Sequence, residues 1–150
     1  MFFMKKTNFL FLNLILFFLS FSSFAQQSKA QWVVGTWKIA KLEIPHYEQL
    51  IAKATPEKKK QYEDELKLIA QSGTFQFKAD GTYYIQFSGN QESGKWKLNQ
   101  YASKLIKEEK MPNGQFMKPD EIGIESLTKN TMILLNDYEA GEIIRLTLKK

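Results

Sequence analysis

Hydrophobic and polar residues alternate with a period of two through most of the chain after residue 73. Phe75 and Phe77 alternate with polar neighbours, and the same alternation returns around Trp96. This period is typical of β-strands that bury one face. Turn-forming pairs such as Asp80-Gly81 separate the alternating segments. The pattern therefore predicts strands over 75–78, 82–87, 95–98, 103–109, 121–127, 132–135 and 142–148.

An earlier apolar segment over 33–44 predicts one more strand. It is rich in β-branched residues and ends at Pro45. Its alternation slips after Trp37, and together with Gly35 this slip indicates a bulge or bend. Eight consecutive strands joined by mostly short connections favour an up-and-down meander, and closing the meander removes its exposed edges. The predicted fold class is mainly β, an eight-stranded antiparallel up-and-down barrel.

The segment over 47–72 has a different period, because its apolar residues are spaced by three and four. Leu66 and Ile69 are examples of this helical spacing. Thr55 is suited to be an N-cap, since Pro56 follows at the first helical position and Glu57 lies in the first turn. We expect a helical insert after the first strand, with a short helix, a break and a longer helix. The insert either covers one mouth of the barrel or flanks its wall.

The first 25 residues have the three parts of a secretory signal peptide. Lys5 and Lys6 precede an apolar run over 9–21, and Ser23 and Ala25 are the small residues that a signal peptidase requires. The run is roughly 13 residues long, whereas a membrane-spanning helix needs ~20. We therefore expect cleavage after Ala25, with an uncleaved membrane anchor as the alternative. The expected mature chain has a flexible lead over 26–31 and one domain over 32–150, exported to the periplasm or secreted.

The composition narrows the possible chemistry. The 21 basic and 16 acidic residues give a net charge of +5, which becomes +3 when the two lysines of the signal segment are removed. The charges interleave, whereas nucleic-acid binding requires basic residues clustered on one face. The chain has no cysteine, which excludes disulfides, thiolate metal sites, a cysteine nucleophile and a lipid-modified N-terminal cysteine. We expect no nucleic-acid partner and no membrane span after signal cleavage.

Catalytic constellations are sparse. The single histidine, His46, follows Pro45 in a polar junction, where a histidine is usually solvated. Glu108 and Glu109 are neighbours on a predicted strand and therefore point to opposite faces. No glycine-rich phosphate loop or nucleophile elbow occurs. We expect no enzymatic activity, no metal and no cofactor, and the alternative is an enzyme that uses Tyr83, His46 or Glu109.

Two short motifs carry a family resemblance. The segment Val34-Gly35-Thr36-Trp37 looks like the Gly-x-Trp signature of the lipocalins, and Gly94-Lys95-Trp96 follows later in the chain. With the helical insert and the Asp80-Gly81 hairpin, the chain resembles the lipocalin-like domains of secreted bacterial proteins over nearly all of 32–150. The resemblance implies a barrel sealed near Trp37.

The same resemblance implies that a basic side chain from the last strand packs over the ring of Trp37. Arg145 is the only arginine in the chain and lies in the last predicted strand. A guanidinium over an indole ring is worth on the order of 1 kcal/mol. However, alternation places Arg145 opposite Ile144 and Leu146, which makes it an outward charge. Both placements stay open, and the structural signature comprises Gly35, Trp37, Gly94 and Arg145.

A closed barrel of eight strands is either filled by side chains or holds one small ligand. The density of aromatic residues fits both outcomes: a packed core, or an apolar pocket in which Tyr83 alone supplies a directional polar group. The resemblance favours a small hydrophobic or amphipathic ligand inside the barrel. The predicted ligand-binding residues are Phe75, Phe77, Tyr83, Ile85, Phe87, Trp96 and Leu98.

The second functional hypothesis is a solid barrel that serves as a structural or interaction module of the cell envelope. Its outer face or helical insert contacts an unknown protein partner. The basic run over 58–60 belongs to the predicted longer helix and is the first place to test for such a contact.

Overall fold

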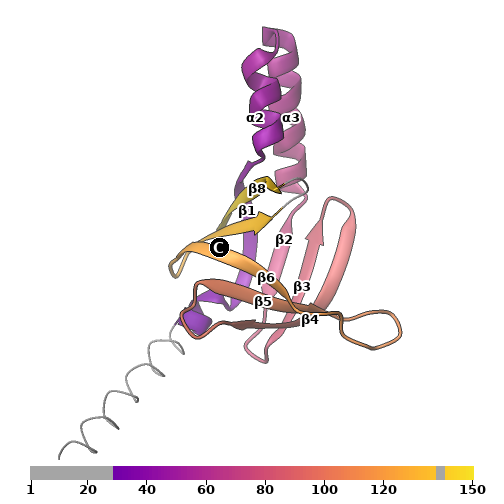
Figure 1. Cartoon of the computed structure of the whole chain (residues 1–150), viewed down its shortest axis with the longest axis vertical. Helices are drawn as coiled ribbons and strands as arrows, with labels where there is room; N and C mark the ends of the chain where they lie inside the picture. Colours follow the sequence, from indigo (N-terminus) through magenta and orange to yellow (C-terminus); the bar gives the residue numbers. More distant parts are fainter. Residues whose placement is uncertain (1–28, 138–140) are drawn as a thin grey trace, which may run out of the picture.

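A closed barrel of eight antiparallel strands makes up most of the protein in a computed structural model, which describes residues 29–137 and 141–150 (Figure 1). Each strand pairs with its sequence neighbours, and β1 pairs with β8 to close the barrel. The predicted fold class, including the helical insert after the first strand, is confirmed. The strands are β1 (Gly35–Glu43), β2 (Thr74–Phe77), β3 (Thr82–Phe87), β4 (Asn90–Leu98), β5 (Lys104–Glu109), β6 (Asp120–Leu127), β7 (Thr131–Asp137) and β8 (Ile143–Lys149), and the helices are α2 (Pro45–Lys53) and α3 (Pro56–Gln71).

The segment before β1 differs from the expectation of a loose lead followed directly by a strand. Residues 29–33 are helical, and Val33 is fully buried. The carbonyl of Val33 accepts a hydrogen bond from Trp37 Nε1 at 2.7 Å, which ties this helical turn to the barrel. The predicted signal peptide over 1–25 and residues 26–28 of the lead lie outside the described residues. Among the residues that the structure describes, no helix is long and apolar enough to cross a membrane.

One end of the barrel is sealed around Trp37, whose side chain is fully buried. Lys150 Nζ lies 4.6 Å from the centre of its ring. The same ammonium donates hydrogen bonds to the carbonyl oxygens of Trp32 at 2.8 Å and Val34 at 2.7 Å. Gly35 makes this arrangement possible, because it adopts φ +139° and a Cβ there would lie 2.9 Å from Lys150 Cε. The Gly-x-Trp segment therefore has a physical role: its glycine admits the lysine that covers its tryptophan.

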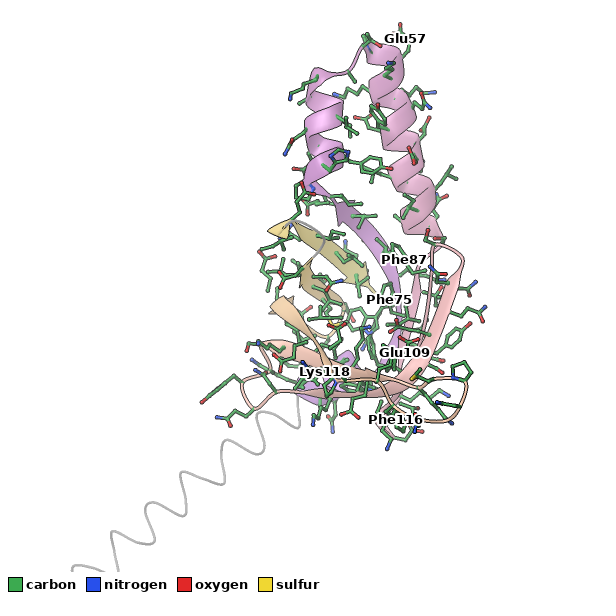
Figure 2. All side chains as sticks on the ribbon, turned by 45° about the vertical axis from the view of Figure 1, so that its right-hand side comes forward. Glu57, Phe75, Phe87, Glu109, Phe116 and Lys118 are labelled. Atoms are coloured by element: carbon green, nitrogen blue, oxygen red, sulfur yellow. The ribbon has the colours of Figure 1, made fainter. Side chains whose placement is uncertain are left out.

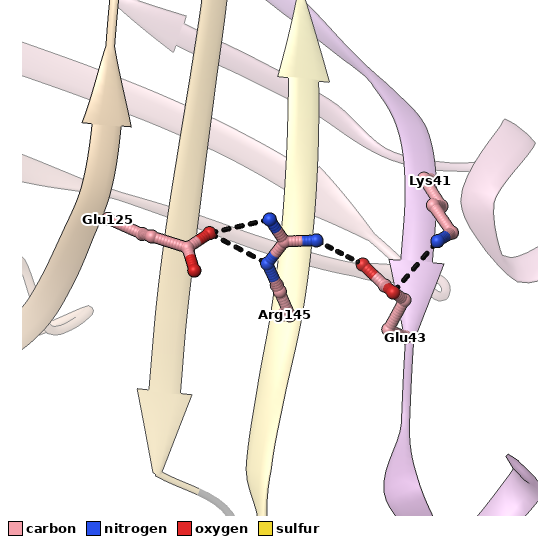
Figure 3. A network of polar contacts seen from close by, with 4 residues as sticks. All are labelled: Lys41, Glu43, Glu125 and Arg145. Atoms are coloured by element: carbon pink, nitrogen blue, oxygen red, sulfur yellow. Dashed lines mark hydrogen bonds and ion pairs between the residues drawn. The ribbon is translucent and has the colours of Figure 1, made fainter.

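Arg145 does not stack on Trp37. It lies on the outer face of β8, where its guanidinium donates to Glu43 on β1 and to Glu125 on β6, both at 2.7 Å (Figure 3). Strand alternation is the cause, because inward-facing residues flank Arg145 on β8. The outward placement is thus confirmed, and the basic group that the resemblance implies comes from Lys150, just after β8.

The inward side chains are most deeply buried near the sealed end. On β8, Leu148 is fully buried while Leu146 and Ile144 are half-buried; on β7, Met132 is fully buried while Asn136 is exposed. The exposure rises toward the end where β3, β5 and β7 finish, which we call the open end. Packed side chains therefore close one end of the barrel, and solvent reaches the other.

The helices α2 and α3 form a hairpin that projects away from the barrel (Figure 1). The break between them is as predicted, since Thr55 caps α3 by accepting a hydrogen bond from the Lys58 amide at 3.5 Å. No side chain of either helix is fully buried. Leu66 and Ala70 of α3 lie along a groove against β1. The insert therefore flanks the wall at its base and does not cover the mouth.

Strand β4 is longer than its alternation predicted, because it begins at Asn90 and not at Lys95. Ser88 and Gly89 both have positive φ angles, 50° and 82°. Two such residues form a tight hairpin turn, so Phe87 pairs directly with Asn90. The extra residues of β4 are mostly polar, so no apolar alternation marks them as a strand in the sequence.

Replacing Lys150 with alanine removes two hydrogen bonds and the cation above Trp37. We expect Lys150→Ala to lower the free energy of unfolding by about 1–3 kcal/mol. Lys149→Ala is the matched control, because Lys149 is exposed. Urea denaturation followed by tryptophan fluorescence measures both variants. Equal losses in the two variants would contradict the sealing role of Lys150.

Glu43 makes the stability depend on pH. Hydrogen bonds from Lys41 and then from Arg145 hold the pKa of Glu43 below its usual value of 4.5. A depressed carboxyl pKa contributes stability above the unfolded-state pKa, and the contribution is lost as the pH falls through the folded-state pKa. We expect Glu43→Gln to cost under about 1 kcal/mol at pH 7, since solvent screens these partly exposed groups.

The cost of Glu43→Gln should shrink toward zero as the pH falls from about 5 to about 3, because both chains then carry a neutral group at this position. Urea denaturation at several pH values in this range measures the change. A cost that stays constant down to pH 3 would show that the ion pairs with Lys41 and Arg145 do not contribute to stability.

Candidate functional site

The predicted ligand-binding residues lie together inside the barrel. Phe77 is central, with its ring 5.5 Å from that of Trp96 in an edge-on arrangement and 6.4 Å from that of Tyr83. Trp96 Nε1 donates to the carbonyl of Lys78 at 3.1 Å, which anchors its ring. These aromatic residues therefore support the core as well as lining the interior. The full set is Phe75, Phe77, Tyr83, Ile85, Phe87, Trp96 and Leu98.

Next to this aromatic region the interior carries charge. Lys107 on β5 is paired in register with Trp96 on one side and Asp120 on the other, so all three share the inner face. Lys107 Nζ lies 2.9 Å from Glu92 Oε1 and 3.2 Å from Asp120 Oδ2. The side chain of Lys107 is 15% exposed, whereas that of Asp120 is 53% exposed. The ion pairs thus run from the interior toward the rim of the open end.

A third carboxylate belongs to the same inner face. Glu109 pairs with Gly94, and Gly94 pairs with Tyr83 on the next strand. Gly94 is required here, because a Cβ at this position would lie 2.0 Å from the carbonyl oxygen of Glu108. In Figure 2, Glu109 lies farther from the helical hairpin than Phe87 does. We call Tyr83, Glu92, Lys107, Glu109 and Asp120 the interior polar cluster.

The hydroxyl of Tyr83 is the most unusual group of this cluster. Tyr83 is only 2% exposed, and its hydroxyl has no hydrogen-bond partner in the described part of the chain. Burial, and next the neighbouring Glu92 carboxylate, raise the pKa of this hydroxyl well above its usual value. The phenol therefore stays protonated. In this conformation the hydroxyl makes no hydrogen bond to the described residues, although the Glu92 carboxylate lies beside it.

Lys107 stays charged in this setting. Burial alone lowers the pKa of its ammonium, but hydrogen bonds and charges from Glu92 and then Asp120 more than offset burial, so the net pKa is raised. A permanently charged ammonium shared by two carboxylates orients both of them. The arrangement is suited to holding polar groups in fixed positions and not to transferring protons near neutral pH.

The expectation that Tyr83 alone supplies a polar group inside the barrel is wrong. Glu92, Lys107 and Asp120 were not predicted, because β4, β5 and β6 have few apolar residues near the open end. The alternation of β5 could have indicated the inward position of Lys107, because residues two apart on a strand face the same side. Leu105 is fully buried in the structure, and Lys107 follows it by two residues.

Glu108 and Glu109 point to opposite faces, as predicted. Glu108 pairs with Lys95 and lines an open groove of about 470 Å³ on the outside of the barrel. Lys97 and Ile106 also line this groove. They alternate along β4 and β5 with the residues that face the barrel interior. The two adjacent glutamates thus serve different surfaces, and only Glu109 belongs to the interior polar cluster.

The remaining candidates for chemistry have local structural explanations. His46 is exposed at the start of α2, with its ring 6.3 Å from that of Tyr47. Asp80 Oδ1 accepts hydrogen bonds from the amide and the hydroxyl of Thr82, which shapes the turn between β2 and β3. Within residues 29–137 and 141–150, no group of three or more acidic or histidine side chains is arranged to hold a metal ion.

Comparisons with known proteins bear on the fold. No protein-family model matches the sequence. No curated protein is a significant match to it. Among solved structures, a DUF4847 family protein from Bacteroides vulgatus is similar, with a TM-score of 0.51 and 15% identity over 79% of this chain and 93% of that one. A lipocalin-like protein from Bacteroides uniformis is also similar, with a TM-score of 0.46 and 12% identity over 79% of this chain and 98% of that one.

At this level of identity the likeness concerns the fold alone. The eight strands follow one another around the barrel without a crossover, and the Gly-x-Trp segment lies at the sealed end. The chain therefore has the closed, eight-stranded up-and-down topology that the sequence resemblance implied.

Proposed function

We propose that the protein binds one small amphipathic molecule at the open end of its barrel. The observation that carries this proposal is the buried Tyr83 hydroxyl, which has no hydrogen-bond partner among the described residues although carboxylates lie close enough to raise its pKa. Leaving a buried polar group unsatisfied costs about 1–3 kcal/mol. Such groups in native structures need an explanation, and a ligand that forms a hydrogen bond with this hydroxyl provides one.

An apolar wall adjoins the interior polar cluster. Ile122 and Ile124 follow Asp120 along the inner face of β6, and Ile85 pairs with Glu92 across β3 and β4. Ile124 is only half-buried. A ligand with an apolar body and a polar end meets both kinds of surface, which is the usual composition of a small-molecule site.

The proposal places this binding outside the cytoplasm. The support is the signal-peptide pattern over 1–25, in which Lys5 and Lys6 precede an apolar run and Ala25 ends it. Without cysteine, the mature chain has no attachment point for a lipid anchor of the lipoprotein type. A periplasmic or secreted protein that holds its ligand by burial fits this pattern.

Binding without chemical conversion is part of the proposal. The raised pKa values of Tyr83 and Lys107 hold both groups in one protonation state near neutral pH. General acid-base catalysis requires groups that exchange protons at the working pH. The interior polar cluster is therefore suited to recognition.

A second candidate function rests on the projecting hairpin of α2 and α3. Its helices bury no side chain fully, so their faces are available to a protein partner. Lys58, Lys59 and Lys60 are exposed near the start of α3. If this hairpin contacts an envelope protein, reversing the three charges to glutamate should abolish crosslinking to that protein in the native envelope. Crosslinking that survives the reversal would place the contact elsewhere.

The proposed ligand site is tested with N-phenyl-1-naphthylamine, a neutral apolar fluorophore. We expect saturable, one-to-one binding to the folded protein. Tyr83→Phe should weaken the competition of decanol with the fluorophore by about five- to tenfold, since the hydrogen bond between the tyrosine and the alcohol is lost. The same variant should raise the free energy of unfolding by up to about 1 kcal/mol, because an unsatisfied buried hydroxyl is removed.

Tyr84→Phe is the matched control for Tyr83→Phe. Tyr84 is the next residue on β3, faces outward and pairs with Ser93 and Gln76. It should leave fluorophore binding and competition unchanged. A barrel that remains folded by circular dichroism but binds no fluorophore would refute the proposal, and a Tyr83→Phe variant less stable than the native chain would show that the hydroxyl has a structural partner.

A further inference from the structure

We propose that the open end of the barrel selects ligands with a positively charged head group, so that the amphipathic ligand is an alkyl or aryl amine. This inference rests on the proposed function and adds the class of ligand. It follows from the balance of charge on the inner face and from the unpartnered hydroxyl of Tyr83.

The inner face carries more negative than positive charge. Glu92, Glu109 and Asp120 share this face with Lys107, since each is paired in register with a buried or inward neighbour. Lys107 is the only basic residue among the inward positions of the described strands. Three carboxylates against one ammonium leave an excess of two negative charges. In a partly buried site such an excess attracts a cation more strongly than in open solvent.

Lys107 does not provide an anion site. Its ammonium already contacts Glu92 Oε1 at 2.9 Å and Asp120 Oδ2 at 3.2 Å. An anionic head group would have to displace one of these carboxylates and then remain close to all three. Separating a partly buried carboxylate such as Glu92 from Lys107 offsets the gain from a new ion pair of the same kind.

Glu109 is the carboxylate that Lys107 leaves available. It lies at the end of β5 and is half-buried, and the structure gives it no ion pair among the described residues. Its register partner Gly94 has no side chain, and Gly94 in turn pairs with Tyr83 on β3. A ligand ammonium beside Glu109 thus replaces the missing partner of this carboxylate.

The Tyr83 hydroxyl is the second, independent observation. It is buried and unpartnered, and strand register places Tyr83 on the same inner face as Glu109, because Gly94 pairs with both residues. Its oxygen accepts a hydrogen bond from an ammonium, while its proton turns toward a carboxylate. The aromatic ring adds attraction for a cation, as aromatic faces do in sites for organic ammonium groups.

Other charged groups near the rim do not reverse this balance. Lys110 and Lys118 lie on the loop between β5 and β6, where both are exposed. Figure 2 labels Lys118 on this loop. Lys95 on the outer face of β4 lies over the ring of Phe116, with Nζ 4.7 Å from its centre. Solvent and salt screen exposed charges of this kind much more than the inward ones.

Three ligands with the same ten-carbon chain test the charge preference. Decylammonium, decanol and decanoate are titrated below their micelle concentrations against the full mature chain loaded with N-phenyl-1-naphthylamine. We expect decylammonium to displace the fluorophore at a concentration at least about tenfold lower than decanoate, with decanol between them. The advantage of decylammonium should fall as salt is added.

Two adjacent residues provide the matched variants. Glu109→Gln removes one inward charge and should weaken decylammonium about tenfold while leaving decanol unchanged. Glu108→Gln removes the same charge from the outer face, where Glu108 pairs with Lys95. It should change neither ligand. Asp120→Asn provides a second inward variant, and circular dichroism verifies that each variant is folded.

The outcomes separate the two proposals. Decanoate that binds as tightly as decylammonium, with fluorophore binding intact, would overturn the charge preference and leave the ligand-binding proposal standing. Equal effects of Glu108→Gln and Glu109→Gln would assign any preference to general surface charge and also overturn it. If the folded protein binds neither the fluorophore nor any of the three ligands, the proposed function itself fails.

Discussion

The structure depends on how the barrel is closed. Strands β1 and β8 come from opposite ends of the domain, and their pairing has to hold without a connecting turn. Trp37 supports this seam from inside: its indole donates to Val33, and the Lys150 ammonium covers its ring. On the outside, Arg145 joins Glu43 across the same seam. Apolar burial provides most of the free energy, and these directional contacts select one register for the closing strands.

A firmly sealed end allows the opposite end to carry unfavourable groups. Charges and an unsatisfied hydroxyl reduce the stability of any core. Here the charged side chains of Glu92, Lys107 and Asp120 are more exposed than residues such as Leu105 at the sealed end, whereas Tyr83 packs beside the buried Phe77. Proteins commonly give up stability at sites that serve function. The burial of side chains inside this barrel decreases from the sealed end to the open end, which is consistent with that division.

The sequence predicted the barrel more completely than it predicted the interior. Period-two alternation around Phe75 and turn pairs such as Asp80-Gly81 are local signals, so strand order and closure followed from them. The cover over Trp37 and the ion pairs of Lys107 depend on which strands become neighbours. Such contacts join residues far apart in the chain, and local pattern alone does not identify them.

The attachment of the α2 and α3 hairpin has a consequence for the dynamics of the protein. The hairpin rests on the barrel only at its base, where Leu66 and Ala70 face β1. Its backbone hydrogen bonds are internal to the helices, so they break and reform without disturbing the sheet. We therefore expect the hairpin to open locally at a lower free energy than the barrel. The length and the surface charge of the hairpin can therefore change during evolution while the barrel keeps its shape.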